Sequence, residues 1–259
     1  MSLLRVIRYA FATGWQEFRT DTWAPGWLLR IVSQAAFFAM LGQLLDSPAR
    51  LEYLLIGNIV AVGALATAIA VPQSTWDRSD GTYPLLVIAP TNLLFPTLGR
   101  TLCRLVGAIL FSLAGFVVLS LLFDIPHPWP EVLAIAPLLA LTCLGCYCLM
   151  LFLGAVANFI PQARNLVHNT ATMSLMAFSG VNVPLSFWPG WLEVIANCLP
   201  ITHGLKAVRL LLTGGDASSI LTAAVLEIAV AASWLTLAAL TMDRMANAGR
   251  ANGSIEFVG

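Results

Sequence analysis

Long apolar runs divide this chain, and each is about as long as a membrane-spanning helix. A helix needs roughly 20 apolar residues to cross the hydrocarbon core of a bilayer. Charged residues make up only 10% of the chain, whereas a soluble domain is about a quarter charged. We therefore expect an all-α membrane protein with a single six-helix bundle. Its predicted spans are Trp27–Leu45, Tyr53–Ser74, Leu105–Phe123, Glu131–Ala157, Leu166–Val183 and Ile220–Met242.

The positions of arginine and lysine predict how these spans are oriented, because cytoplasmic loops carry an excess of both residues. With a cytoplasmic N-terminus, only Arg50, Lys206 and Arg209 lie outside. The even number of spans then places both termini in the cytosol, with residues 243–259 as a cytoplasmic tail. The arginines on the inside are Arg5, Arg8, Arg19, Arg30, Arg78, Arg100, Arg104, Arg164, Arg244 and Arg250.

Residues 1–26 are predicted to contain an amphipathic helix instead of a span. Apolar residues such as Ile7 and Ala10 recur at steps of three and four, whereas Arg5 and Arg8 fall mostly on the other face. Such a helix lies in the membrane interface with its arginines toward the lipid headgroups. Packing against the bundle is compatible with that position.

Small residues line one face of the second predicted span. Gly57, Ala61, Ala64 and Ala68 recur there at steps of three and four. Small side chains let helix backbones approach closely in lipid. This face is predicted to pack against another helix, within the chain or across a dimer.

Residues 184–215 are apolar but too broken to form a span, because Pro184, Pro189 and Pro200 interrupt helices. Two short helices that dip in from the outer face are predicted, at roughly Trp191–Cys198 and Ile201–Leu212. Tryptophan prefers the headgroup level of a bilayer. The residues expected to shape an outer gate are Trp188, Trp191, Pro200 and His203.

The fifth predicted span is the most polar, and the sixth carries Glu227. Polar groups avoid lipid tails, so we expect them at the bundle interior, a subunit contact or a water-filled route. Glu227 is a functional candidate on the same ground, although a carboxyl that only accepts hydrogen bonds is an open alternative. The candidates for a pathway or a dimer seam are His168, Asn169, Thr172, Ser179, Asn182 and Glu227.

A short charged segment lies between the second and third spans, on the predicted cytoplasmic side. Charged residues come first, followed by a Gly-Thr pair and an apolar stretch. The segment suits a short helix across the inner face that presents charge to a cytosolic partner, and a solvated loop is the alternative. Its residues are Trp76, Asp77, Arg78, Asp80, Gly81 and Thr82.

Two chemical activities lack support in the sequence. A phosphate-binding P-loop needs a lysine before serine or threonine, and the single lysine, Lys206, is followed by Ala207. Cys143 and Cys146 have the spacing of a metal or redox pair, but they lie in an apolar run without a nearby histidine or carboxylate. We expect these thiols to pack as small apolar groups, and we expect no metal site and no catalytic residue.

The motifs in these segments resemble those of ABC-2 type transporter permeases. The C-terminal signature is carried by SGVNVPLSFWPGWL at residues 179–192 and by LPITHGLKAVR at residues 199–209. The sequence RSDGTYPLLVIAP at residues 78–90 is similar to the cytoplasmic stretch of the same family. One departure is that Tyr83 and Pro84 replace the usual glutamate after the Gly-Thr pair. The length is similar to that of the drug-exporter and lipo-oligosaccharide branches.

The resemblance implies a permease that works as a dimer in a bacterial inner membrane. Two cytosolic nucleotide-binding subunits would hold ATP and Mg²⁺, and this chain would bind no cofactor. The segment from Trp76 to Thr82 would be the coupling helix, residues 1–26 the interface helix, and the two short outer helices a re-entrant pair. ATP binding by the partner would close the dimer and push substrate outward.

Several alternatives remain at the level of sequence. The cargo is expected to be an amphipathic drug, antibiotic or lipid, and a polysaccharide or lipo-oligosaccharide is the alternative. An ion-coupled transporter would use Glu227 and His168 as proton sites. An intramembrane serine protease would use Ser179 and His203, although its nucleophile motif is incomplete.

Overall fold

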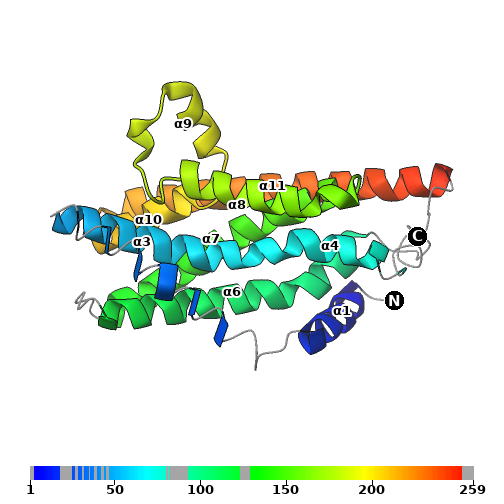
Figure 1. Cartoon of the computed structure of the whole chain (residues 1–259), viewed down its shortest axis with the longest axis horizontal. Helices are drawn as coiled ribbons and strands as arrows, with labels where there is room; N and C mark the ends of the chain where they lie inside the picture. Colours follow the sequence, from blue (N-terminus) through cyan, green and yellow to red (C-terminus); the bar gives the residue numbers. More distant parts are fainter. Residues whose placement is uncertain are drawn as a thin grey trace.

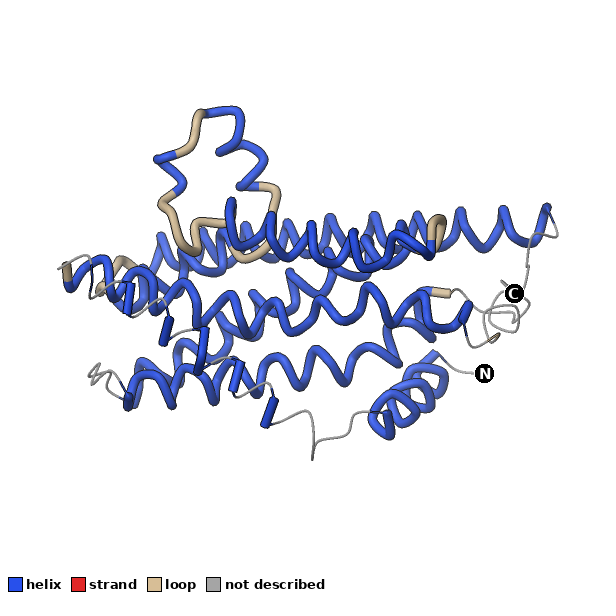
Figure 2. Tube along the Cα trace, in the orientation of Figure 1, coloured by secondary structure: helices blue, strands red, loops and turns tan. Residues whose placement is uncertain are grey.

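The fold is that of a computed structural model of the chain (Figure 1). It describes residues 3–17, 25–26, 29–30, 32–34, 36–37, 40–41, 44, 47–79, 81, 93–122 and 129–252. Every regular element within these ranges is a helix, as Figure 2 shows. Much of the first predicted span, Trp27–Leu45, lies outside the described residues, as do Asp80 and Thr82.

Four helical segments of the described chain are long and apolar enough to cross a membrane. They correspond to the second, third, fourth and sixth predicted spans and run side by side along the long axis of the molecule (Figure 1). The first and fifth predicted spans have no such counterpart among the described residues. The four segments are Ala49–Gln73, Leu94–Val118, Leu133–Ala157 and Ala217–Asn247.

The second predicted span is the central column of the bundle. It consists of α3 (Pro48–Leu65), the 3₁₀ turn η1 (Ala66–Ile69) and α4 (Ala70–Ser79). The predicted small-residue face is confirmed, because Ala61 and Ala64 are fully buried. A side chain at Gly63, on the same helix, would collide with Ser112 of the neighbouring column.

The third span is longer than predicted. α6 (Leu94–Leu122) begins well before the expected start at Leu105. Arg100 and Arg104 interrupt the apolar run there, which made the sequence look non-spanning, but both lie within the helix. The first turns of α6 are stabilised by contact with another helix.

That helix is α1 (Leu3–Glu17), which confirms the predicted amphipathic helix and packs on the start of α6. The contact is close, because a side chain at Gly14 would collide with the backbone of Arg100. Arg5 and Arg8 remain exposed, as the amphipathic pattern predicts. We call this end of the bundle the α1 end and the opposite end the far end (Figure 1).

The last two long helices complete the bundle. α7 (Trp129–Ala157) agrees with its predicted span, and α11 (Ala217–Asn252) packs along it. Asp216 caps α11 by accepting a hydrogen bond from the Ser219 N–H, and bonds from Ser218 and Ser219 lower the pKa of Asp216 to about 2. α11 continues past the predicted end at Met242, so the first part of the expected tail is helical.

The fifth predicted span, Leu166–Val183, is wrong as a continuous helix. After the short turn η2 (Pro161–Ala163), α8 (Arg164–Phe178) starts at the α1 end and stops part of the way along the bundle (Figure 1). Its 15 residues rise about 23 Å, which is less than the roughly 30 Å of a hydrocarbon core.

Two short helices follow close to their predicted bounds. A loop with the 3₁₀ turn η3 (Leu185–Phe187) leads to α9 (Gly190–Asn197), which projects from the side of the bundle (Figures 1 and 2). α10 (Thr202–Leu212) then packs against α7 and α11 and leads to the far end. Thus α8 and α10 each cover part of the bundle length, and the projecting hairpin of residues 179–201 joins them.

Candidate functional site at the break between α8 and α10

The fifth predicted span is broken between α8 and α10, and two residues with unusual backbone conformations flank this break. Gly180 has a φ of 77°, which glycine adopts without strain, and this turn ends the path of α8. Ile201, directly before α10, has a φ of 81°. A branched side chain disfavours that conformation by about 1–3 kcal/mol. The neighbouring contacts must therefore hold Ile201 in place.

Glu227 of α11 provides those contacts. Its Oε1 accepts a hydrogen bond from the Ile201 N–H at 3.2 Å, and its Oε2 accepts one from the Gly204 N–H at 2.9 Å. The first N–H groups of a helix have no partner within the helix, and the positive end of the helix dipole favours a carboxylate. The fully buried Glu227 therefore caps α10, which supports the hydrogen-bonding alternative for this residue.

α7 leaves space for this cap. A side chain at Gly145 would collide with Oε1 of Glu227, and one at Gly204 would collide with Thr142. Both glycines are therefore needed where α7, α10 and α11 meet. The contact explains why the Thr-His-Gly sequence at residues 202–204 contains a glycine.

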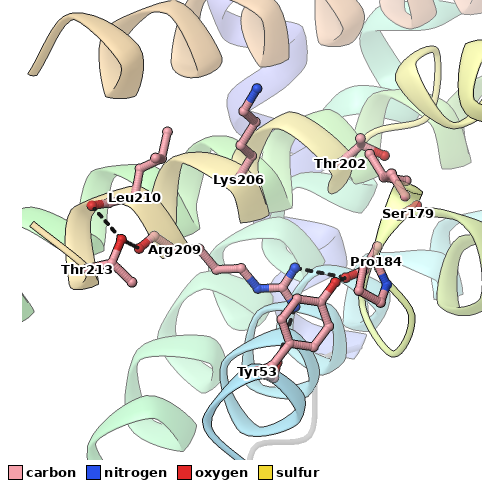
Figure 3. Close-up of a pocket in the computed structure, with 10 residues that line it drawn as sticks. Tyr53, Ser179, Pro184, Thr202, Lys206, Arg209, Leu210 and Thr213 are labelled. Atoms are coloured by element: carbon pink, nitrogen blue, oxygen red, sulfur yellow. Dashed lines mark hydrogen bonds between the residues drawn. The ribbon is translucent and has the colours of Figure 1, made fainter. Parts of the chain in front are cut away.

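Arg209 ties the other side of α10 to the column of α3. Its Nη1 donates to the Gly180 carbonyl at 2.9 Å, and its Nη2 donates to the Tyr53 carbonyl at 3.1 Å. The guanidinium carbon lies 3.5 Å from the centre of the Tyr53 ring, and the Tyr53 hydroxyl donates to the same Gly180 carbonyl. Figure 3 shows Arg209 lying against this ring. The sequence motifs did not indicate this role of Arg209, although a lone arginine in an apolar helix was a usable signal.

A chain of amide groups continues this polar region toward the first predicted span. The Asn58 amide donates to Oδ1 of Asn182 at 3.0 Å, and the Gln34 amide donates to Oδ1 of Asn58 at 3.3 Å. Asn182 also donates to the carbonyl of Met176. These bonds hold the half-buried Asn182 against α3, and they add Asn58 and Gln34 as partners that the sequence did not indicate.

His168 stabilises a different discontinuity, in the column of α3 and α4. Pro72 lacks an N–H, so it cannot donate an α-helical hydrogen bond to the Ala68 carbonyl four residues earlier, and the Ala70 N–H of the 3₁₀ turn η1 is directed at this carbonyl instead. Nδ1 of His168 lies 3.0 Å from this carbonyl. Since a carbonyl only accepts, Nδ1 carries the proton. Neighbouring helices commonly satisfy backbone groups that proline frees in a membrane.

The other predicted pathway residues on α8 and beyond it are not brought together. The Thr172 hydroxyl donates to the His168 carbonyl within α8, and the Ser179 hydroxyl donates to the Pro200 carbonyl. Asn169 is exposed on the surface of the chain. Of the six predicted residues, His168 and Thr172 thus contact each other within α8, Asn169 is exposed, and Ser179, Asn182 and Glu227 form separate contacts at the break.

The four predicted gate residues lie in or beside the projecting hairpin. Trp188 packs edge-on against Phe178, with ring centres 5.5 Å apart, whereas Trp191 is 67% exposed. Pro200 is buried at the base of the hairpin, and Nε2 of His203 donates to the Asn197 carbonyl. Three of the four therefore hold the hairpin, and Trp191 alone presents its ring outward.

The predicted coupling segment is a continuation of α4. Trp76, Asp77 and Arg78 lie in the last turns of this helix, so the prediction of a separate short helix is wrong for these residues. No proline or glycine follows Pro72 until Gly81, whose φ of 69° ends the helical path. The described part of the segment lies at the α1 end of the bundle (Figure 1).

The structure gives no support to the protease alternative. Ser179 and His203 donate to two different backbone carbonyls and do not contact each other as nucleophile and base would. Cys143 and Cys146 are buried, as the packing interpretation predicts. No group of three potential metal ligands occurs within the described ranges.

A family comparison identifies the architecture that these residues build. The family model for ABC-2 type transporters matches residues 9–213, which include the second part of α1, the central column and the whole break between α8 and α10. No curated protein matches the chain. Because the match covers most of the sequence, this multi-pass membrane chain belongs to the ABC-2 type transporter family.

Proposed function

We propose that this chain is the membrane subunit of an ATP-driven exporter and that two copies, or one copy and a homologue, enclose the route for the cargo. Family membership supports a permease of an ABC transporter. The proposal that two subunits enclose a route rests on α8. This helix stops part of the way along the bundle and leaves polar side chains on an open face.

That open face consists of exposed residues on α8. Asn165, Asn169 and Thr170 are exposed, next to the 71% exposed Met173. Amide side chains are costly against lipid tails. A second subunit or a water-filled route therefore covers this face in the assembled transporter. His168 and Thr172, which lie beside it, have local partners and shape the column.

A separate nucleotide-binding subunit supplies the energy. The α1 end carries Arg5 and Arg8 on α1 and Arg78 at the end of α4. This excess of positive charge supports a cytoplasmic position for that end and for both termini. The residues proposed to contact the ATPase are Trp76, Asp77, Arg78, Asp80, Gly81 and Thr82, and ATP and Mg²⁺ bind to the partner.

The contacts around the break between α8 and α10 can transmit movement from the α1 end of the bundle to the far end. α10 is fixed to α11 through Glu227 and to α3 through Arg209. A shift of the central column at the α1 end is therefore carried to α10 and to the hairpin with Trp188 and Trp191. We propose that this movement opens the far end toward the outside, with Pro200 and His203 as the base of the gate.

The proposed cargo is an amphipathic small molecule, such as a drug or antibiotic, or a lipid. The exposed rings of Phe187 and Trp191 and the exposed Ile195 make the hairpin surface apolar. The same aromatic rings also suit a polysaccharide or lipo-oligosaccharide, which is the second candidate cargo.

Reconstitution tests this function. The chain is placed in liposomes with the nucleotide-binding subunit that co-purifies with it from the native host, and transport of a fluorescent amphipathic dye is followed. We expect dye movement only with the partner, ATP and Mg²⁺ together, and none with the chain alone. Transport by the chain alone on a proton or sodium gradient would contradict the proposal and favour an ion-coupled carrier.

A further inference from the structure

A cavity of about 270 Å³ opens beside α10, between the break and the far end. Tyr53 forms part of its wall, and the loop after α8 forms another part through Gly180 and Pro184. Figure 3 shows Lys206 extending from α10 away from Arg209, which lies against Tyr53. The cavity lining therefore includes an exposed cation, Lys206, and a half-buried cation held by hydrogen bonds, Arg209.

Neither cation is neutralised by a carboxylate. None of the ten residues that line the cavity is acidic. Lys206 is exposed and makes no hydrogen bond or ion pair with the residues that the structure describes. Among the residues that the structure describes, Arg209 donates to neutral carbonyl groups alone and contacts the Tyr53 ring. Its charge thus stays uncompensated in a half-buried position, where positive potential is screened less than in water.

The other residues that line the cavity determine which kind of ligand fits beside the two cations. Leu185, Leu210 and Pro184 provide apolar surface next to the two cations. The hydroxyls of Thr202 and Thr213 already donate to backbone carbonyls and have no proton to offer. An uncharged sugar would find few donors here, whereas an anion with an apolar chain would contact both kinds of surface.

We propose that this cavity binds the phosphate or carboxylate headgroup of an anionic amphiphile. The ammonium group of Lys206 contacts the anion, Arg209 supplies a fixed positive field, and the leucines contact the start of the apolar chain. The headgroup belongs either to an anionic bilayer lipid or to an anionic cargo. Only the second source rests on the proposed export function.

Lys206 is the single lysine of the chain, so an amine-reactive reagent reports on this site alone apart from the N-terminal amine. The full chain is placed in nanodiscs of phosphatidylcholine, with or without phosphatidylglycerol. The rate of Lys206 acylation is measured by peptide mass spectrometry. We expect acylation to slow about fivefold with the anionic lipid, the factor that an ion pair of about 1 kcal/mol produces. High salt should remove the effect.

A matched control separates binding in the cavity from general surface charge. The variant Arg50→Lys adds a second amine at an exposed position outside the cavity, near the far end. An anionic surface slows acylation at both positions, whereas a headgroup in the cavity slows Lys206 more. Equal slowing at positions 50 and 206 would overturn the proposal.

A second experiment separates the two sources of the headgroup. Dodecyl phosphate is added to the phosphatidylcholine nanodiscs, with dodecanol as the uncharged control. Protection by phosphatidylglycerol identifies a lipid site, and protection by dodecyl phosphate alone identifies a site for a free amphiphile. Protection by neither anion, or equal protection by dodecanol, would contradict the proposal.

A variant that lacks the Lys206 ammonium group allows lipid binding to be measured without labelling. Native mass spectrometry should show bound phosphatidylglycerol on the wild type and on Arg50→Gln, and about fivefold less on Lys206→Gln. Lys206 is exposed, so this substitution should not affect folding. Equal lipid retention by all three proteins would overturn the proposal. No ATPase or transport is involved, so failure of the export function would leave these results unchanged.

Discussion

At the residue scale, the most informative side chain is Glu227. The sequence marked it as unusual because a carboxylate in an apolar helix is costly. The sequence could not show its partners, because Ile201 and Gly204 lie on a different element and their N–H groups are free only at the start of α10. The location of the polar residue was thus predictable, whereas its role depended on where α10 begins.

The cap predicts a graded loss of stability. Glu227→Ala leaves two buried N–H groups without an acceptor, at about 1–3 kcal/mol each. Glu227→Gln keeps one acceptor oxygen and should lie between alanine and the wild type. Thermal unfolding in detergent, followed by the reaction of a thiol dye with the buried Cys143 and Cys146, measures the order. Equal stability of all three proteins would contradict the cap.

Gly145 provides a double-mutant test of the same contact. Gly145→Ala should destabilise the wild type, because the added methyl collides with the Glu227 carboxyl. In the Glu227→Ala background that collision is absent, so the added cost should be smaller. Additive effects in the same thermal assay would show that the two residues do not interact.

At the element scale, sequence patterns located the helices better than the breaks between them. Apolar runs marked α7 correctly because no charged residue follows Glu131 in its first turn, and they missed the start of α6 because Arg100 and Arg104 lie within that helix. The end of α8 was missed because Gly180 turns the chain there, and a single glycine followed by Val181 and Val183 does not by itself mark the end of a span. The projecting hairpin follows from these turns and could not be placed from composition.

The hydrogen bond between His168 of α8 and the Ala68 carbonyl of η1 predicts that removal of a proline rescues a His168 variant. His168→Ala should lose about 0.5–1.5 kcal/mol, because the Ala68 carbonyl loses its hydrogen bond from the imidazole ring. Replacing Pro72 by alanine in that variant restores an N–H four residues after Ala68 and should recover much of the loss. The thermal assay applied to both variants tests this prediction, and an unchanged loss in the double variant would exclude the bond from His168.

At the scale of the whole molecule, the proposed function requires a second membrane subunit. The proposal rests on the exposed amides of α8, because amide side chains are costly against lipid tails. Family membership was predictable from the motifs at residues 78–90 and 179–209, since both are short and local. The subunit arrangement depends on contacts between copies, which no local motif encodes.

Cross-linking along α8 tests most directly whether two membrane subunits face each other across a shared route. Asn169→Cys is introduced into the full chain after replacement of the exposed Cys198 by serine, and native membranes are treated with a short thiol cross-linker. Leu237→Cys, at an exposed position on α11, is the control. We expect a covalent dimer from Asn169→Cys, with a yield that changes when the ATPase partner binds ATP, and little dimer from the control. Equal yields from the two positions, or no dimer from Asn169→Cys, would contradict a shared route along α8.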